Sequence, residues 1–307
     1  MNLARESFYT LIFQVSGFVC TTIAGILIAR ILGPSNRGII TVTMLYPLFF
    51  STIFNLTAGS VIIHHMGKKE YESKAFAGSA LIMLVAISIL ALVVFFVTIG
   101  PFREIFYKGI ELKYLRIACV STPFYLLLYY FSSILQGSMD IRRFNIANQL
   151  PLFSNLFLIL IFIALQKFTA LIAVVAGISG IAIGGIFSLF NVMKRTDGLS
   201  FNRQLTGRLI KDSAKIHVGA IATFIFMQAI FYILNYYAAP SEVGFYSVAF
   251  SLANIIFFFS LSLEIGLYPK MAHETMEEAI KLVQVATRQI LLITASAALI
   301  MAVFSKS

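Results

Sequence analysis

Amide and hydroxyl side chains recur at helical spacing inside the apolar stretches of this 307-residue chain. Near the N-terminus, Gln14, Gly17 and Thr21 fall on one helical face, and further on Gln228 and Asn235 stand two helical turns apart. Such groups are costly in lipid, so they normally face protein or a water-filled cavity. Neutral donors and acceptors of this kind suit the hydroxyl groups of a carbohydrate. Hydrogen bonding between neighbouring helices accounts equally well for each residue taken singly.

Arginine residues near the ends of the apolar stretches add a second kind of chemistry. A planar guanidinium group binds phosphate oxygens through paired hydrogen bonds, so Arg30, Arg116 and the adjacent Arg142–Arg143 pair are candidate contacts for a diphosphate. The adjacent pair fits a simpler role as the anchor of a loop equally well. The candidate substrate-binding residues are Gln14, Arg30, Asn55, Arg116, Gln136, Arg142, Arg143, Gln149, Asn155, Gln228, Asn235 and Asn254.

Acidic residues are scarce inside the apolar stretches. Glu264 is the one such acid, and it is a candidate for binding a proton or sodium ion, or for an interfacial ion pair near Lys270. The chain has three Asp, none paired or one residue apart, so the groups needed for acid–base catalysis are not apparent. Cys20 and Cys119 lie in apolar stretches and lack the spacing of a metal site or disulfide. We expect no catalytic residue, no metal and no cofactor.

The elements that must position these groups are membrane-spanning helices. Hydrophobic residues make up 59% of the chain and charged residues only 12%, far from the composition of soluble domains. A backbone in lipid must satisfy its own hydrogen bonds, which favours helices of about 20 residues. The sequence therefore predicts an all-α polytopic membrane protein with about nine transmembrane helices. The predicted spans are residues 7–31, 39–63, 75–100, 115–135, 146–165, 169–192, 218–239, 245–268 and 285–304.

The net charge of +10 follows the membrane topology. Most of the 23 Lys and Arg fall in the loops that share one side with the N-terminus, and the positive-inside rule makes that side cytoplasmic. The basic residues sit beside apolar helices, so we do not expect a nucleic-acid partner. The first apolar stretch is too long for a signal peptide core and is expected to be retained.

A short repeat divides the chain into two lobes. The loop PSNRG at residues 34–38 recurs as PSEVG at residues 240–244, and each copy joins one span to the next in the same direction. This is the pattern of a parallel repeat in a two-lobed transporter. It predicts a six-helix bundle over residues 1–192 and a partial bundle of three helices over residues 216–307. The second bundle is then incomplete, because the chain is truncated or because another chain completes it.

Two segments carry more local signals. Residues 193–215 are expected to form a basic cytoplasmic linker, in which an amphipathic helix over 200–215 turns Arg and Lys toward anionic lipid head groups. A merely solvated connector is the alternative. The sixth span carries Ala176, Gly180, Gly184 and Ser188 at intervals of four, a small-residue ridge that lets membrane helices approach closely.

Three runs of sequence resemble a known family. IARILGPSNRGIITVTMLYP, ILQGSMDIRRFNIANQLP and VGFYSVAFSLANIIFFFSLSLEIGLYPKMA are similar to connections in Wzx-type polysaccharide biosynthesis flippases, of the multidrug/oligosaccharidyl-lipid/polysaccharide exporter superfamily. The resemblance extends over essentially the whole chain. It implies two bundles around a central cavity in the bacterial inner membrane. It also implies transfer of an undecaprenyl-diphosphate-linked oligosaccharide, such as an O-antigen unit, to the outer leaflet, with a polysaccharide polymerase and glycosyltransferases as possible partners. The family usually has twelve or more helices, more than this chain provides.

Two other functions compete with this one. A membrane-embedded glycosyltransferase or polymerase of the same pathway would need acids or a nucleophile that the sequence does not display. A multidrug or cation exporter of the same superfamily would share the architecture, but it would need negative charge in its cavity. The basic excess of this chain favours an anionic cargo.

Overall fold

The structure, a computed structural model, describes residues 3–196, 198–253, 267–268, 271 and 276–304. Every regular element in those residues is a helix, which confirms the all-α prediction. Asn254 and Glu264 lie outside the described residues. The helices are α1 (Leu3–Phe54), α2 (Ala58–Gly67), α3 (Ser73–Phe106), α4 (Leu112–Cys119), α5 (Ser121–Gly137), α6 (Ile141–Ala164), α7 (Ala170–Thr196), α8 (Arg203–Tyr237), α9 (Pro240–Ala253) and α11 (Met276–Phe304).

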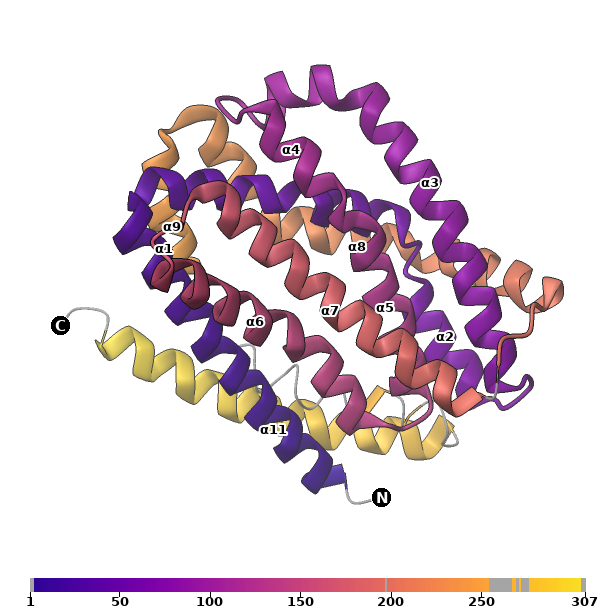
Figure 1. Ribbon diagram of the computed structural model, residues 1–307. Coiled ribbons are helices and arrows are strands. Elements are labelled where there is room, and N and C mark those ends of the chain that lie inside the picture. Colours follow the sequence, from indigo (N-terminus) through magenta and orange to yellow (C-terminus); the bar gives the residue numbers. More distant parts are fainter. Residues whose placement is uncertain (1–2, 197, 254–266, 269–270, 272–275, 305–307) are drawn as a thin grey trace.

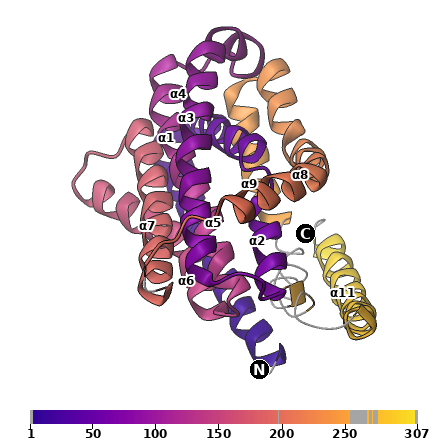
Figure 2. The ribbon, with the colours of Figure 1, turned by 90° about the vertical axis from the view of Figure 1, so that its right-hand side faces the viewer.

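Six stretches of the described chain are long and apolar enough to cross a membrane, judged by length and composition. They lie in α1, in α3, in α4 with α5, in α6, in α7 and in α8. Figure 1 shows these helices packed side by side, and Figure 2 shows α11 standing apart from them. The protein is therefore a multi-pass membrane protein, as its composition predicts.

Helix α1 contains two arms that meet at Gly33, where φ is 83° and ψ is 162°. Pro34 follows directly, and a residue before proline is disfavoured in the helical conformation, so the helix breaks here. The positive φ explains why this position is a glycine. Figure 1 shows the two arms diverging from this point. The arms correspond to the first and second predicted spans.

The second predicted span is broken again, between α1 and α2. Leu56 and Thr57 both have positive φ, 53° and 56°. The freed backbone groups find partners: the Thr57 amide donates to Asn55 Oδ1 over 2.6 Å, and the Tyr130 hydroxyl donates to the Asn55 carbonyl over 3.0 Å. A non-helical backbone at membrane depth is tolerated only with such partners.

The small-residue ridge of α7 packs as predicted. A β-carbon at Gly180 would clash with the carbonyl of Pro151, and one at Gly184 would clash with the carbonyl of Ala147, so α6 and α7 approach through backbone. A β-carbon at Gly185 would come within 3.1 Å of the Leu127 side chain and 3.2 Å of the Phe124 carbonyl, both on α5. This packing makes α5, α6 and α7 one tight group.

Helix α8 differs from the expectation for residues 200–215. These residues do not form a separate surface helix: α8 begins at Arg203 and continues without a break to Tyr237. Leu205 and Leu209 are completely buried in a core cluster with α3 and α5 residues, so the apolar side faces protein. The buried stripe continues through Ser213 to His217 at intervals of four, and no proline interrupts the helix there. The basic side chains opposite it are exposed.

Candidate functional site

The two copies of the sequence repeat meet in the structure. Gly38 packs against the carbonyl of Pro240, and Gly244 packs reciprocally against the carbonyl of Pro34. A β-carbon at either glycine would clash with the opposite backbone. A reciprocal contact of this kind is the signature of a two-fold relation between the two parts. We call the contact between residues 34–38 and 240–244 the repeat clasp.

Arg37 belongs to the repeat clasp and projects into the helix interface. A β-carbon at Gly25, on the first arm of α1, would lie only 3.3 Å from Arg37 Nη2. The small space around the guanidinium is also lined by Thr21, Thr22 and Ser251. Arg37 Nε is buried and has no hydrogen-bond partner, and no carboxylate pairs with Arg37 within the part of the chain described here. The clasp therefore presents a positive charge to a polar helix interface.

A polar chamber lies toward the opposite end of the helices. Its volume is about 400 Å³, and it is walled by α2, α5, α6 and α8. Helix α5 supplies most of its polar lining, because four of its lining residues recur at helical spacing. The lining residues are Ser60, Ile63, Tyr129, Ser132, Ser133, Gln136, Phe144, Asn148, Ile216 and Tyr268. None of them carries a formal charge, so the chamber offers hydrogen bonds without an ionic partner.

Helix α8 is held to the break between α1 and α2 by hydrogen bonds. His217 contacts Thr57 Oγ1 through Nδ1 over 3.0 Å and the Ile53 carbonyl through Nε2 over 2.7 Å. Nearer the basic end, His65 Nε2 lies 3.1 Å from Asp212 Oδ2. These contacts fix the α8 wall of the polar chamber against the first bundle. We call them the α8 latch.

Replacing His217 with phenylalanine is expected to destabilise the protein. The substitution keeps an aromatic ring but leaves the Ile53 carbonyl without its donor, which costs about 1–3 kcal/mol at a buried site. Thermal unfolding of the purified protein in detergent should show a midpoint several degrees lower. His64→Phe, at an exposed position on α2, is the matched control and should leave the midpoint unchanged. Equal midpoints for the two variants would contradict the role assigned to His217.

One of the amides predicted to contact sugar lines the polar chamber, and others lie in the interfaces between helices. Gln136 lines the polar chamber. Asn55 instead stabilises the α1–α2 break, and Asn235 donates to the Phe106 carbonyl over 3.1 Å. Gln149 lies against Gly17, and its Oε1 has no partner among the described atoms; the same holds for Oδ1 of Asn155. Gln14 and Gln228 are partly buried.

The predicted arginines lie at the ends of the helices. Arg30, Arg116 and Arg142 are exposed. Arg143 forms an ion pair with Asp140, which also pairs with Arg195 over 2.5 Å. Asp140 caps α6 as well, accepting a hydrogen bond from the Arg143 amide. The Arg142–Arg143 pair thus separates into one free-standing side chain and one that anchors a loop.

Sequence reasoning missed Arg37 and placed it in a loop between two spans. The structure instead folds the loop into α1, so that Arg37 faces the first arm across the turn at Gly33. The available signal was the arginine within the repeat together with the Thr21 and Gly25 face of the first span. Recognising it required knowing that the two arms pack against each other.

The fold is similar to that of solved transporters of the MOP superfamily. A multidrug resistance MATE family transporter of that superfamily matches with a TM-score of 0.78, 14% identity, and coverage of 99% of this chain and 72% of the other. The MATE transporter VcmN of Vibrio cholerae matches at 0.70, with 15% identity and coverage of 98% and 74%. A MOP superfamily transporter from Pyrococcus furiosus, described as having a binding pocket of reverse polarity, matches at 0.73, with 16% identity and coverage of 98% and 71%.

Residues 3–273 match the family described as polysaccharide biosynthesis protein, and the chain belongs to that family. The identities to the solved structures are low, so those structures establish the fold alone. No curated protein is significantly similar to the chain. The family agrees with the resemblance that the three sequence runs carry.

Proposed function

We propose that the protein moves a lipid-linked oligosaccharide, carried on undecaprenyl diphosphate, from the inner to the outer leaflet of the bacterial cytoplasmic membrane. The observation that carries this proposal is the polarity of the helix interface. The polar chamber offers uncharged hydroxyl and amide groups among apolar side chains, and within the described residues Arg37 Nε has no hydrogen-bond partner and no carboxylate pairs with Arg37. The first set suits sugar hydroxyls and the second suits a diphosphate.

The arrangement of the contacts suits alternating access. In this conformation the repeat clasp closes the helices at one end, while the polar chamber occupies the other. Rocking of the two repeats about the chamber would open the clasp and carry the cargo from one side to the other. The cargo is released without chemical change, so we expect no glycosyl transfer by this protein.

The competing cargo is a cationic drug, because MATE transporters share the fold. Neither the chamber nor the space around Arg37 is lined by an acid among the residues that the structure describes. A cation would lack a partner there and would be repelled by Arg37. The Pyrococcus furiosus transporter is described as having a reverse-polarity pocket that suggests a different function, which supports the view that pocket polarity distinguishes members of this fold.

The proposal is tested with the purified protein in proteoliposomes that contain a fluorescent undecaprenyl-diphosphate oligosaccharide in one leaflet. We expect protein-dependent appearance of the fluorophore in the other leaflet, measured by its accessibility to a membrane-impermeant quencher. Efflux of ethidium from the same vesicles should be at background. Ethidium transport without lipid transfer would replace our proposal by cation export. Transfer of a labelled sugar from a nucleotide sugar would indicate an enzyme instead.

Narrowing the polar chamber should slow this transfer. Ile216 projects from α8 into the chamber and is 46% exposed, so Ile216→Trp places a bulky ring in the path of the oligosaccharide. We expect the transfer rate to fall roughly tenfold, which corresponds to about 1.4 kcal/mol. Val218→Trp, at a 74% exposed position outside the chamber lining, is the control and should transfer normally. Equal rates for the two variants would show that the cargo does not pass through the chamber.

A further inference from the structure

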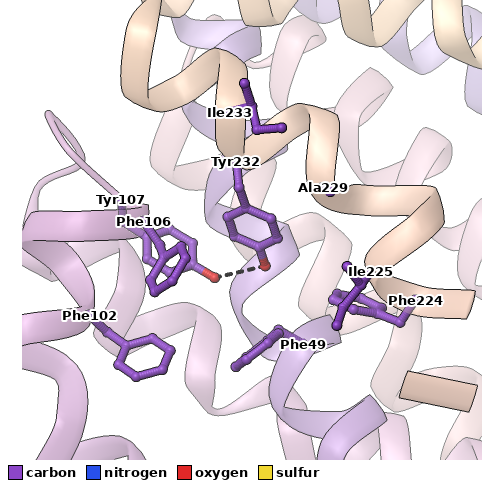
Figure 3. A pocket seen from close by; sticks show the side chains of 9 residues that line it. All are labelled: Phe49, Phe102, Phe106, Tyr107, Phe224, Ile225, Ala229, Tyr232 and Ile233. Atoms are coloured by element: carbon purple, nitrogen blue, oxygen red, sulfur yellow. Dashed lines mark hydrogen bonds between the residues drawn. The ribbon is translucent and has the colours of Figure 1, made fainter. Parts of the chain in front are cut away.

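An aromatic recess lies between α1, α3 and α8, apart from the polar chamber. Its volume is about 360 Å³, within the range of small-molecule pockets. Figure 3 shows aromatic rings from all three helices gathered around it. The lining residues are Phe49, Phe102, Phe106, Tyr107, Phe224, Ile225, Ala229, Tyr232 and Ile233. Each of them lies in or next to a stretch that is long and apolar enough to cross a membrane.

The recess offers no polar group to an occupant. Its side-chain oxygens belong to Tyr107 and Tyr232, whose hydroxyls lie 3.0 Å apart and point at each other in Figure 3. The Tyr232 hydroxyl also donates to the Leu45 carbonyl over 3.3 Å, so Tyr107 is the donor within the pair. Both hydroxyls are thereby engaged. A polar ligand would lose its hydrogen bonds to water without compensation, so the recess selects against one.

The mouth of the recess opens onto an exposed apolar surface of the spanning helices. Ile225 and Ile233 line the recess and are 54% and 51% exposed, and Phe106 is 39% exposed. Beside them, Ile105 and Phe226 are 53% and 81% exposed. We infer that apolar side chains this exposed in a spanning segment face the hydrocarbon of the bilayer. The hydrocarbon adjoining the mouth can therefore enter the recess without crossing a polar barrier.

We propose that the aromatic recess binds one hydrocarbon chain of a membrane lipid. Its walls come from the first bundle, through α1 and α3, and from α8 beyond the linker, so a bound chain contacts both parts of the protein. Burial of apolar surface supplies the binding energy, and the aromatic rings provide most of that surface. The occupant is an acyl chain of a bilayer phospholipid, because that is the hydrocarbon adjoining the mouth of the recess. Binding does not depend on the function proposed above.

Photolabelling of the full chain in proteoliposomes tests this site. One set of vesicles contains a phospholipid with a diazirine in one acyl chain, and a second contains a polyprenyl phosphate with a diazirine in its chain. After irradiation, mass spectrometry locates the label. We expect the phospholipid probe to label residues 102–107 and 224–233 above the rest of the exposed apolar surface. Labelling spread evenly over exposed apolar residues with both probes would overturn the proposal.

A substitution that fills the recess provides the control. Ala229→Phe should reduce labelling of the recess at least fivefold, whereas Ala222→Phe, at an exposed position outside the recess on the same helix, should not. If Ala229→Phe does not fold, Ile233→Trp fills the mouth from an exposed position. Undiminished labelling in the filled variant would also overturn the proposal. Labelling of the recess by the acyl probe supports the proposal, whereas labelling by the polyprenyl probe alone, displaced by unlabelled polyprenyl phosphate, would replace the phospholipid by a lipid-linked molecule.

Discussion

Replacing Arg37 with alanine is expected to nearly abolish lipid-linked oligosaccharide transfer. The guanidinium is the charge that the helix interface offers to a diphosphate, and truncating one partner of a buried charge contact costs about 2–5 kcal/mol. That range corresponds to a loss of roughly 30-fold or more in transfer at subsaturating cargo. The measurement is the initial rate of leaflet transfer in proteoliposomes, together with the affinity for a short-chain polyprenyl diphosphate in detergent.

The controls separate charge from position. Arg203→Ala removes an exposed arginine that is not among the candidate contacts, and it should leave both readouts close to those of the unmodified protein. Arg37→Lys keeps the positive charge but loses the planar guanidinium that binds phosphate through two hydrogen bonds, so its transfer rate should lie between those of Arg37→Ala and the unmodified protein. If Arg37→Ala unfolds at the same thermal midpoint as the unmodified protein, the loss of transfer is not caused by a loss of folding. Normal transfer by folded Arg37→Ala would remove this residue from the site.

Enlarging Gly38 is expected to hold the repeat clasp open. A leucine at this position would drive its side chain into the carbonyl of Pro240, and because the contact is reciprocal, Gly244→Leu should produce the same defect against Pro34. Overpacking of this kind costs about 1–3 kcal/mol. The closed arrangement would then lose population by roughly 5-fold to 150-fold. Transfer should fall by at least tenfold in both variants, since each cycle passes through the closed clasp.

Spin labels report the clasp directly. After replacement of Cys20 and Cys119 by alanine, labels at Asn36→Cys and Glu242→Cys should give a longer distance distribution in Gly38→Leu than in the parent. Gly219→Leu is the control, because a β-carbon at Gly219 meets nothing within 4 Å. An unchanged distance in Gly38→Leu would mean that the clasp does not separate the two repeats.

Much of the fold follows from hydropathy, which is a local property. The multi-pass helical fold and the ridge of Gly180 and Gly184 were predictable, because apolar length and small-residue spacing act within one helix or between neighbours. The break at Leu56 was not predictable. Leucine and threonine do not favour positive φ, so Leu56 and Thr57 give no sign of a break. The backbone carbonyls around the break are satisfied by Tyr130 and His217, which are distant in sequence.

The site was less predictable than the fold. Gln136 was identified from its polarity and lines the chamber. Asn235 was identified in the same way, but it donates a hydrogen bond to the Phe106 carbonyl. Sequence alone does not distinguish these uses, because both place an amide inside an apolar helix. Arg37 was overlooked because its depth depends on the turn at Gly33. The charge of the helix interface thus depends on how the helices pack, which the sequence alone does not give.

The His217 contact with the Ile53 carbonyl links motion of α8 to hydration. That carbonyl lies at the end of α1 next to the break, so when α8 swings away the oxygen loses its donor. A backbone oxygen without a donor inside a spanning segment is unfavourable, so we expect a water molecule to replace the imidazole. Separation of α8 from α1 is therefore expected to require entry of water beside Ile53.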